Sequence, residues 1–405
     1  MTEDSEIVVV GGGILGLCTA LELCRAGAGV VHVVERAAPG AATTQAGAGF
    51  LDLWATTQAG AEEEVAVEEY GAEFYASLAS RHDIGFVQRG NVWLALTEGA
   101  WERKLKPLLE HPATAGAQRL TPEEAAELVA VLQPKGLFAA VYQPRGARLT
   151  TASAAEAIGE EIEGFGGQIS TDLEITGIES AGGRVAGVTT SLGGIRADAV
   201  VIAAGAWTNA ILESLGIWVP MVPLAATRFL TEPAEIPGEM PSILVPEMSD
   251  LYVREYGGAL TWGCLYGASP RYDFSAVPPP VEIGGPSPQG VDEMLAIAKR
   301  IRKTIPPLAE LPRTASFTGF PCHTPDYRAM LGPVGGIEGL WLAAGDNYAG
   351  VTHGPGFGRL LADLIMRRPS IADCQSFSPE RFANGTYAST ADVLAAPLVQ
   401  TAGWA

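Results

Sequence analysis

The chain contains few cysteines, few histidines and few positive charges. It has five cysteines, an odd number without metal-ligand spacing, at Cys18, Cys24, Cys264, Cys322 and Cys374. This pattern argues against a disulfide framework and a metal site, and it is typical of a reducing compartment. Lysine and arginine number 26 against 46 aspartates and glutamates, which gives a net charge of −20. Nucleic acid and an anionic membrane are therefore unfavourable partners.

Long apolar runs are also absent from the sequence. No stretch approaches the roughly 20 apolar residues that span a bilayer. Residues 1–6 (MTEDSE) are acidic and lead directly into a predicted strand, which is unlike a secretory signal peptide. We therefore expect a cytoplasmic protein. A chain of 405 residues predicts one large domain or two interleaved domains.

A dinucleotide-binding pattern lies near the amino terminus. Residues 7–10 form a short apolar run typical of a buried parallel strand. Gly11, Gly13 and Gly16 follow in G-x-G-x-x-G spacing. Such glycines permit a tight turn, the close approach of a pyrophosphate and the packing of the next helix on the strand. We expect that helix from about Ile14 to Arg25, with its amino end facing the phosphates.

The next predicted strand, 30–34, ends at Glu35, whose carboxylate would lie at the ribose hydroxyls of an adenosine. An acidic residue here disfavours NADP, but this unit alone leaves NAD and FAD open. Two later segments, 197–216 and 339–366, each predict another buried strand followed by a helix, which begins at about Gly354 in the second. Several returns of the chain to one sheet favour a long, extended cofactor.

Between these segments the pattern is mixed. Helical periodicity is present in 62–82, 122–131 and 291–305, whereas 86–96 and the hairpin 252–267 are expected to be strands. A proline-rich stretch, 278–288, predicts a surface loop. These features predict an α/β protein with a Rossmann-like domain made of discontinuous segments and a second, mixed-sheet (α+β) domain.

Taken in order, the motifs resemble those of the D-amino-acid-oxidase-like FAD-dependent oxidoreductases. This superfamily includes glycine oxidase, sarcosine oxidase, and the dimethylglycine and sarcosine dehydrogenases. The resemblance covers about residues 5–370 and is specific to the superfamily rather than to one member. It rests on Gly11/Gly13/Gly16 with Glu35, TTQAGAGF (43–50), VVIAAGAW (200–207), YVREYGG (252–258), TPDYRAMLGP (324–333) and GVTHGPGFGRLLADLI (350–365).

The resemblance implies an FAD-binding domain made of 1–45, 145–215 and 312–370. A substrate domain made of 46–144 and 216–311 would cover the flavin, and 371–405 would be a carboxy-terminal extension. In the segment 345–352, backbone N–H groups would face the pyrimidine edge of the flavin and stabilise negative charge there. The implied cofactor contacts are Gly11, Gly13, Ile14, Leu15, Gly16, Glu35, Arg36, Thr43, Thr44, Ala46, Gly47, Ala48, Gly49, Ala204, Gly205, Trp207, Gly345, Asn347, Gly350, Val351 and Thr352.

A cluster of reactive side chains, Cys322, His323 and Asp326, lies in one of these motifs. Superfamily members with covalent flavin attach it through a cysteine at the position of Gly319 or a histidine at the position of Ala46. Neither attachment residue is present, so the resemblance implies non-covalent FAD. We interpret Cys322 and His323 as packing beside the cofactor, and a reactive or flavin-linked Cys322 thiolate stays open as an alternative.

Amine oxidation of this type moves a hydride from the carbon next to nitrogen to flavin N5, and water then hydrolyses the imine. Relatives that act on amino acids bind the substrate carboxylate with a cation, but the matching positions here are Pro321 and Thr352. A basic residue that aids oxygen reduction in sarcosine oxidase is replaced by Thr261. These departures argue against simple turnover of glycine, sarcosine or D-alanine.

The nearest remaining cations are Arg228 and Arg254, and we predict Arg254 as a carboxylate anchor. Aromatic candidates for the pocket walls are Tyr252, Tyr348 and Trp54. His353 is a candidate acid–base group, with a structural role as the alternative. The predicted catalytic residues are thus Arg254, His353, Tyr252 and Tyr348.

The first functional hypothesis is an FAD-dependent oxidase or dehydrogenase acting on a C–N bond of a small amine or an unusual or N-substituted amino acid. Reoxidation of the flavin by O2 would give H2O2. Two alternatives stay open: D-amino-acid oxidation with Arg254 as the anchor, and a flavin-binding subunit of a heteromeric amine oxidase. An NAD-dependent dehydrogenase is least favoured. The expected partners are the amine or amino-acid substrate and O2, and the protein is expected to be a monomer or a homo-oligomer.

Overall fold

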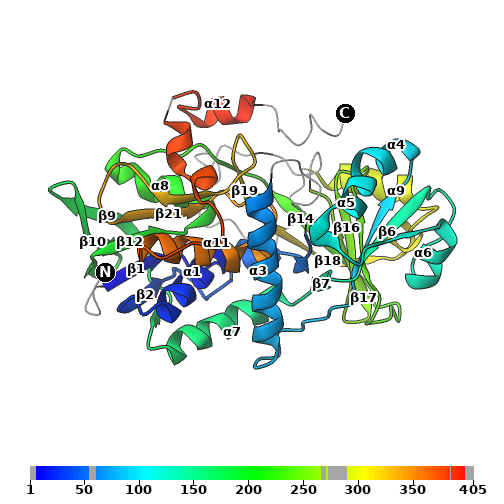
Figure 1. The fold of residues 1–405 in the computed structure, drawn as a ribbon, viewed down its shortest axis with the longest axis horizontal. Helices are drawn as coiled ribbons and strands as arrows, with labels where there is room; N and C mark the ends of the chain where they lie inside the picture. Colours follow the sequence, from blue (N-terminus) through cyan, green and yellow to red (C-terminus); the bar gives the residue numbers. More distant parts are fainter. Residues whose placement is uncertain (1–5, 54–60, 266–270, 272–289, 384, 397–405) are drawn as a thin grey trace.

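The computed structural model describes residues 6–53, 61–265, 271, 290–383 and 385–396 of the 405-residue chain. Its two large sheets lie at opposite ends of the molecule, on the left and the right of Figure 1, and α3 (Glu62–Ala79) lies between them. Trp54 and the proline-rich stretch 278–288 lie outside the described residues.

The six-stranded sheet carries the predicted nucleotide-binding strands. All neighbouring strands pair in parallel except the first two in its order. Near its middle, Val8 is in register with Val200 on one side and His32 on the other. The predicted Rossmann-like arrangement of distant segments is therefore confirmed. The order is β20 (Met330–Pro333), β21 (Leu340–Ala344), β12 (Ala199–Ile202), β1 (Glu6–Val10), β2 (Val30–Val34) and β8 (Gln168–Ser170).

Both faces of this sheet are covered, because successive side chains of a strand point to opposite faces. Ile7 and Val9 share one core with the helices α1 (Ile14–Arg25), α7 (Thr151–Gly164) and α11 (Gly350–Ile365). Val8 and Val10 share another core with a three-stranded antiparallel sheet. That sheet consists of β9 (Ile175–Ala181), β10 (Arg184–Thr190) and β11 (Gly193–Arg196).

The helices α1 and α11 lie very close together. A Cβ atom at Gly358 of α11 would lie 2.6 Å from the backbone carbon of Cys18 in α1. Only glycine permits this approach without a shift of one helix. The close packing fixes the first turn of α11 relative to the glycine turn that precedes α1.

The eight-stranded sheet forms the other end of the molecule. Its strands pair antiparallel except β15 with β4. One face packs on α6 (Pro122–Leu128), α9 (Val291–Ile301) and α10 (Pro307–Glu310). The order is β18 (Arg313–Gly319), β14 (Ala226–Thr231), β17 (Ala259–Gly263), β16 (Leu251–Tyr256), β15 (Ser242–Val245), β4 (Asn91–Ala95), β6 (Ala139–Gln143) and β5 (Gln118–Leu120).

Shorter elements complete the described residues. Two small antiparallel ladders pair β3 (Phe50–Leu51) with β7 (Ala147–Arg148) and β13 (Val222–Pro223) with β19 (Cys322–His323). The short α-helices are α2 (Thr43–Ala46), α4 (Glu98–Ala100), α5 (Lys106–Glu110), α8 (Thr208–Leu212) and α12 (Thr390–Ala395).

Several predicted boundaries differ from the structure. The helix expected from about Gly354 begins one turn earlier, at Gly350. Pro355 therefore lies inside the helix. The segment 86–96 is a strand only over Asn91–Ala95. Strand β18 belongs to the eight-stranded sheet, although the boundary predicted at residue 312 placed it with the FAD-binding segments.

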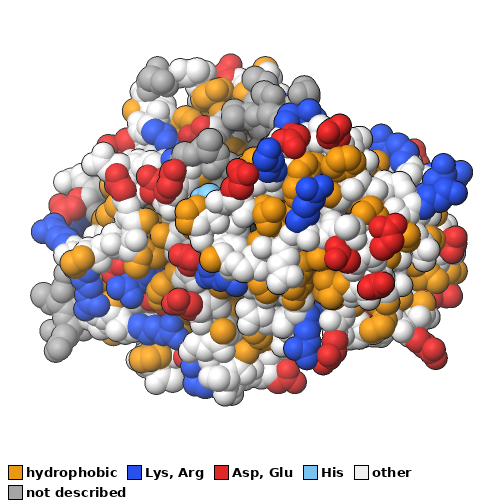
Figure 2. All heavy atoms as spheres, turned by 45° about the vertical axis from the view of Figure 1, so that its right-hand side comes forward, with side chains coloured by type: hydrophobic (Ala, Val, Ile, Leu, Met, Phe, Trp, Pro, Cys, Tyr) orange, Lys and Arg blue, Asp and Glu red, His pale blue; other side chains and the backbone are white. Residues whose placement is uncertain are grey.

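The surface is mixed in charge on the face shown in Figure 2, where Lys and Arg are interspersed with Asp and Glu. Within the described residues, no helix combines the length and the apolar character needed to cross a membrane.

Candidate functional site

The glycine turn after β1 is built by close contacts. Gly11 has a φ of +107°, and a Cβ atom there would lie 2.5 Å from the carbonyl oxygen of Ala203. A Cβ atom at Gly16 would lie 2.1 Å from the carbonyl oxygen of Gly11. Gly13 differs, because the nearest heavy atom to its Cβ position is Thr44 Oγ1 at 3.7 Å. Gly11 and Gly16 thus permit packing, and Gly13 leaves an open space.

Glu35 follows β2 and is held in one orientation. Its Oε2 accepts a hydrogen bond from Gly12 N at 2.7 Å, and its Oε1 accepts one from Ala37 N at 2.9 Å. The neighbouring Arg36 guanidinium lies 3.8 Å from the ring centroid of Trp207. These residues form one end of a large cavity.

The cavity has a volume of about 610 Å³, which is within the range of ligand sites. It extends from the glycine turn to the eight-stranded sheet, where Ala226, Tyr252 and Leu265 line it. Every predicted cofactor residue lines it except Gly16. The structure therefore brings together, in one cavity, segments that lie more than 300 positions apart in the sequence.

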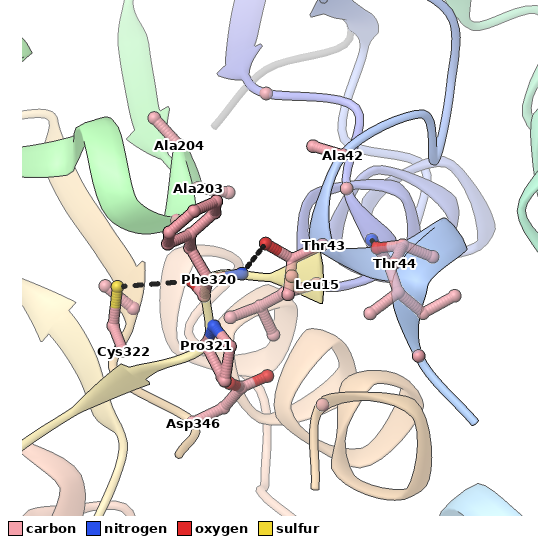
Figure 3. Close-up of a pocket in the computed structure, with 18 of the residues that line it drawn as sticks. Leu15, Ala42, Thr43, Thr44, Ala203, Ala204, Phe320, Pro321, Cys322 and Asp346 are labelled. Carbon is pink, nitrogen blue, oxygen red and sulfur yellow. Dashed lines mark hydrogen bonds between the residues drawn. The ribbon is translucent and has the colours of Figure 1, made fainter. Parts of the chain in front are cut away.

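The segment 42–50 forms one wall and is fixed by its threonines. Thr44 Oγ1 accepts a hydrogen bond from Ile14 N at 2.9 Å, at the start of α1. Thr43 Oγ1 accepts one from Phe320 N at 3.0 Å, as Figure 3 shows. This wall is thereby attached both to the glycine turn and to the segment after β18.

The first turn of α11 forms the facing part of the lining. Gly350, Val351 and Thr352 all line the cavity, and the free N–H groups and dipole of a helix amino end favour negative charge. Asn347, with a φ of +60°, donates from Nδ2 to the carbonyl oxygens of Tyr327 at 2.8 Å and Gly345 at 3.1 Å. These bonds fix the turn that precedes the helix.

Asp346 is the acidic residue of this turn and lines the cavity (Figure 3). Burial raises the pKa of its carboxyl group to about 6, although His353 acts in the opposite direction. Asp346 therefore takes up a proton at a higher pH than an exposed aspartate and is mostly a carboxylate at neutral pH.

Aromatic side chains surround the end of the cavity at the eight-stranded sheet. The rings of Phe50 and Tyr252 meet edge to face with centroids 5.4 Å apart. Tyr348 donates a hydrogen bond from its hydroxyl to the carbonyl oxygen of Leu265 at 3.2 Å. Tyr252 and Tyr348, both predicted from the sequence, thus line the cavity with Phe50 and Leu265.

Arg254 and His353 do not line the cavity within the described residues. Arg254 is buried and donates from Nη2 to the carbonyl oxygen of Leu149 at 3.2 Å. Burial, followed by the nearby Arg148 and Arg228, lowers the pKa of Arg254 to about 9. The structure therefore does not bring this guanidinium to the place where a carboxylate anchor was predicted.

His353 points to a carboxylate behind the cavity wall. Its Nε2 lies 3.1 Å from Oε1 of Glu68, whose side chain has 0% exposure. The pKa of His353 is lowered, because burial outweighs the opposite effects of the nearby Asp346 and Glu64. The contact with Glu68 fits the structural alternative that the sequence left open.

Cys322, His323 and Asp326, the three members of the reactive cluster, each have different surroundings. Cys322 lines the cavity and its Sγ lies 3.8 Å from the carbonyl oxygen of Phe320 (Figure 3). His323 is buried between the rings of Tyr327 and Tyr348, at centroid distances of 5.1 and 4.4 Å. Asp326 pairs with a residue of the carboxy-terminal segment. Each of the three side chains therefore contacts a different part of the structure.

Sequence reasoning missed part of the lining. The segment 173–176, together with Ala210 and Ile211, lines the cavity near Trp207. The signal was present for 173–176, because this segment follows the parallel strand β8 and ligands bind at the carboxyl ends of parallel strands. Ala226, at the start of β14, and Leu265, after the end of β17, had no such signal, because only the tertiary arrangement brings them to the cavity.

Residues 6–364 match the family described as FAD dependent oxidoreductase. The chain belongs to this family. The predicted superfamily is therefore confirmed, with FAD as its cofactor and oxidation–reduction as its enzyme class. The residues present fit FAD: Gly13 leaves an open space, Glu35 lies at the adenosine end, and the cavity continues to the second sheet.

Known proteins resemble the chain along almost its whole length. Glycine oxidase of Pseudomonas aeruginosa is 29% identical over 396 residues, which cover 93% of this chain and 99% of that protein. The 4-methylaminobutanoate oxidase (formaldehyde-forming) of Paenarthrobacter nicotinovorans is 27% identical over 389 residues, 93% of this chain and 45% of that protein. The structure of L-proline dehydrogenase from P. horikoshii has a TM-score of 0.81 at 24% identity, covering 95% of this chain and 99% of that one. This last likeness shows the fold.

Proposed function

We propose that this protein oxidises a C–N bond in a small amine or an unusual or N-substituted amino acid, using non-covalently bound FAD. FAD bound in this cavity would supply the acceptor for a hydride from the carbon next to nitrogen, and the substrate's own nitrogen lone pair would form the C=N bond. Water then hydrolyses this imine to a carbonyl compound and an amine. Dioxygen accepts the two electrons and two protons and leaves as H2O2.

The main support for this proposal is the shape of the cavity. A single cavity joins the glycine turn and Glu35 at one end to Phe50, Tyr252 and Tyr348 at the other. An extended dinucleotide anchored at the first end would present its reactive ring to the second. The relatives named above, glycine oxidase and 4-methylaminobutanoate oxidase, support the oxidation of a C–N bond rather than another substrate class.

The side chains at the second end supply orientation rather than an acid or a base. Phe50, Tyr252 and Leu265 present apolar surface, and the Tyr348 hydroxyl is committed to a backbone carbonyl. A neutral amine needs no protein base for hydride loss, since its own lone pair assists. Positioning of the C–H bond over the reacting ring then accounts for much of the rate enhancement. The first turn of α11 favours the negative charge that arrives with the hydride.

The test is reduction of the bound flavin by amines in the absence of oxygen. Mixing the purified protein anaerobically with a panel of amines and amino acids should bleach the flavin absorbance near 450 nm, and readmission of air should restore it with release of H2O2. If no member of the panel bleaches this absorbance, the proposed function is overturned. Bleaching without reoxidation by air would retain amine oxidation and replace O2 by another acceptor.

A further inference from the structure

We propose that the substrate is an amine with no carboxylate on the carbon bonded to its nitrogen. This inference rests on the proposed function and narrows its substrate class. It comes from the charges around the substrate end of the cavity, defined here as the part lined by Phe50, Ala226, Tyr252, Leu265 and Tyr348.

Among the described residues that line the cavity, Arg36 is the only lysine or arginine. Its guanidinium lies over the Trp207 ring at 3.8 Å. Arg36 directly follows Glu35, whose carboxylate is bonded to the glycine turn at Gly12. This cation therefore belongs to the adenosine end, and the described substrate end has no cation in its lining.

The remaining segments of the chain do not change this charge count. They are 1–5, 54–60, 266–270, 272–289, 384 and 397–405, and none of them contains a lysine or an arginine in the sequence. The cation missing from the described lining therefore cannot come from a lysine or arginine of these segments.

Arg228 lies close to the cavity but is committed to other groups. It donates from Nε to the carbonyl oxygen of Ala46 at 2.8 Å and from Nη1 to Thr261 Oγ1 at 3.0 Å. Its guanidinium also lies 4.2 Å from the ring centroid of Phe317. Since Ala46 lines the cavity and Arg228 does not, this guanidinium lies behind the wall and supports its backbone.

Arg254 and Arg271 are held in the same way. Arg254 donates to Leu149 O at 3.2 Å, in the strand-to-helix connection beside Gly49. Arg271 donates from Nη1 to the carbonyl oxygen of Ala396 at 3.1 Å. An arginine that binds a carboxylate directs a fork of two N–H groups at it, and both side chains direct N–H groups at backbone carbonyls instead.

The groups that do line the substrate end favour an amine and disfavour an acid. Phe50, Tyr252 and Leu265 offer apolar surface and ring faces, and Asp346, in the turn before α11, adds an acidic side chain to the lining of the same cavity. Aromatic faces and a carboxylate attract a cation or a polar N–H group. A substrate carboxylate in the same place would lose its water without gaining a cation.

Pairs of compounds that differ only by the carboxylate test this inference. Dimethylamine and sarcosine, pyrrolidine and proline, and N-methylbenzylamine and N-methylphenylglycine would each be mixed anaerobically with the FAD-loaded protein. We expect the amine of at least one pair to reduce the flavin at least tenfold faster than its carboxylated partner. Faster reduction by the carboxylated partners would overturn the inference and leave the proposed function intact.

Ligand binding gives a second readout that does not depend on turnover. Benzoate and benzamide have similar shape, and only benzoate is charged, so their dissociation constants can be compared by perturbation of the flavin spectrum. We expect benzoate to bind no more tightly than benzamide. Tighter binding of benzoate by tenfold or more would show a cation at the site and overturn the inference, even if no amine reduces the flavin. If no amine or amino acid reduces the flavin at all, the proposed function is overturned, independently of the benzoate result.

A matched pair of variants tests whether a cation placed at the substrate end changes carboxylate binding. Leu265 lines the substrate end and is partly exposed, so Leu265→Arg would add a guanidinium there, and Leu265→Gln is the uncharged control. We expect L265R to bind benzoate at least tenfold more tightly than L265Q, and to move the preference toward carboxylated substrates. Equal benzoate binding by both variants, with tight binding in the unmodified protein, would show that an existing cation already serves the site.

Discussion

The guanidinium of Arg381 forms a two-pronged pair with the carboxylate of Asp326. Its Nε lies 2.6 Å from Oδ2, and its Nη2 lies 3.0 Å from Oδ1. The same Nη2 donates to the carbonyl oxygen of Arg328 at 2.7 Å. The carboxy-terminal segment, for which the sequence showed no role, therefore fixes the turn that follows Cys322 and His323.

Replacement of Arg381 by lysine should destabilise this turn. Lysine keeps the charge but cannot reproduce the planar fork that bonds both oxygens of Asp326. We expect Arg381→Lys to lower the free energy of unfolding by about 2 kcal/mol, typical of hydrogen bonds to a charged group, as measured by urea denaturation. Arg89→Lys is the control, because the Arg89–Glu239 pair is exposed, and it should leave the unfolding midpoint unchanged. Equal effects of the two substitutions would contradict this role of Arg381.

Replacement of Gly13 by alanine should separate cofactor binding from folding. The backbone at Gly13 has φ −70° and ψ 171°, which alanine adopts without strain. The added methyl group would face the cavity, where the nearest heavy atom of the protein is 3.7 Å away. We expect unchanged stability of the FAD-free protein and at least a tenfold weaker affinity for FAD, measured by flavin fluorescence titration.

Gly27→Ala is the control, because it should lower stability without changing FAD affinity. Gly27 has a φ of +70° and no heavy atom within 4 Å of its Cβ position. Alanine there is strained by its backbone alone, at a cost of about 1 kcal/mol. Its stability should fall while its FAD affinity is unchanged. An unchanged FAD affinity in Gly13→Ala would show that the pyrophosphate does not approach this glycine.

The nucleotide end of the site could be predicted from the sequence because its determinants are local. Gly11 and Glu35 follow strands at fixed positions, and backbone geometry alone restricts what can occupy them. The structure indeed places both in the lining of the cavity. The fold class followed from the same periodic apolar runs.

The substrate end could not be predicted to the same depth, because side-chain direction depends on tertiary packing. Arg254 lies in the predicted hairpin, but the Leu149 carbonyl draws its guanidinium away from the cavity. The helix α11 begins at Gly350 rather than at about Gly354, and its position depends on close packing against α1. Leu265, which follows β17, reaches the lining only through the tertiary arrangement of the chain.

His323 should make stability decrease on acidification. Burial, with a smaller effect of Arg271, lowers the pKa of His323 to about 3, whereas an unfolded histidine has a pKa near 6.5. Below pH 6.5 the unfolded chain therefore binds a proton that the folded protein does not, and stability falls as the pH falls toward 3. Relative to His323→Gln, the unfolding free energy of the protein should fall by about 1.4 kcal/mol per pH unit in this window.

Urea denaturation of both proteins at several pH values between 8 and 5 measures this difference. Above pH 7.5 the difference between the two should be constant, since His323 is neutral in both the folded and the unfolded state. A constant difference down to pH 5 would mean that His323 binds a proton in the folded protein, against the burial between Tyr327 and Tyr348.

Cys322 should neither bind FAD covalently nor be needed to hold it. Burial, and then the nearby Asp346, raise the pKa of the Cys322 thiol, so the reactive thiolate is scarce near neutral pH. After acid precipitation, we expect the yellow colour in the supernatant and a colourless pellet for both the unmodified protein and Cys322→Ser. FAD content before precipitation should be equal in the two. A yellow pellet that becomes colourless on Cys322→Ser substitution would establish a flavin–thiol bond, and the non-covalent assignment would then be wrong.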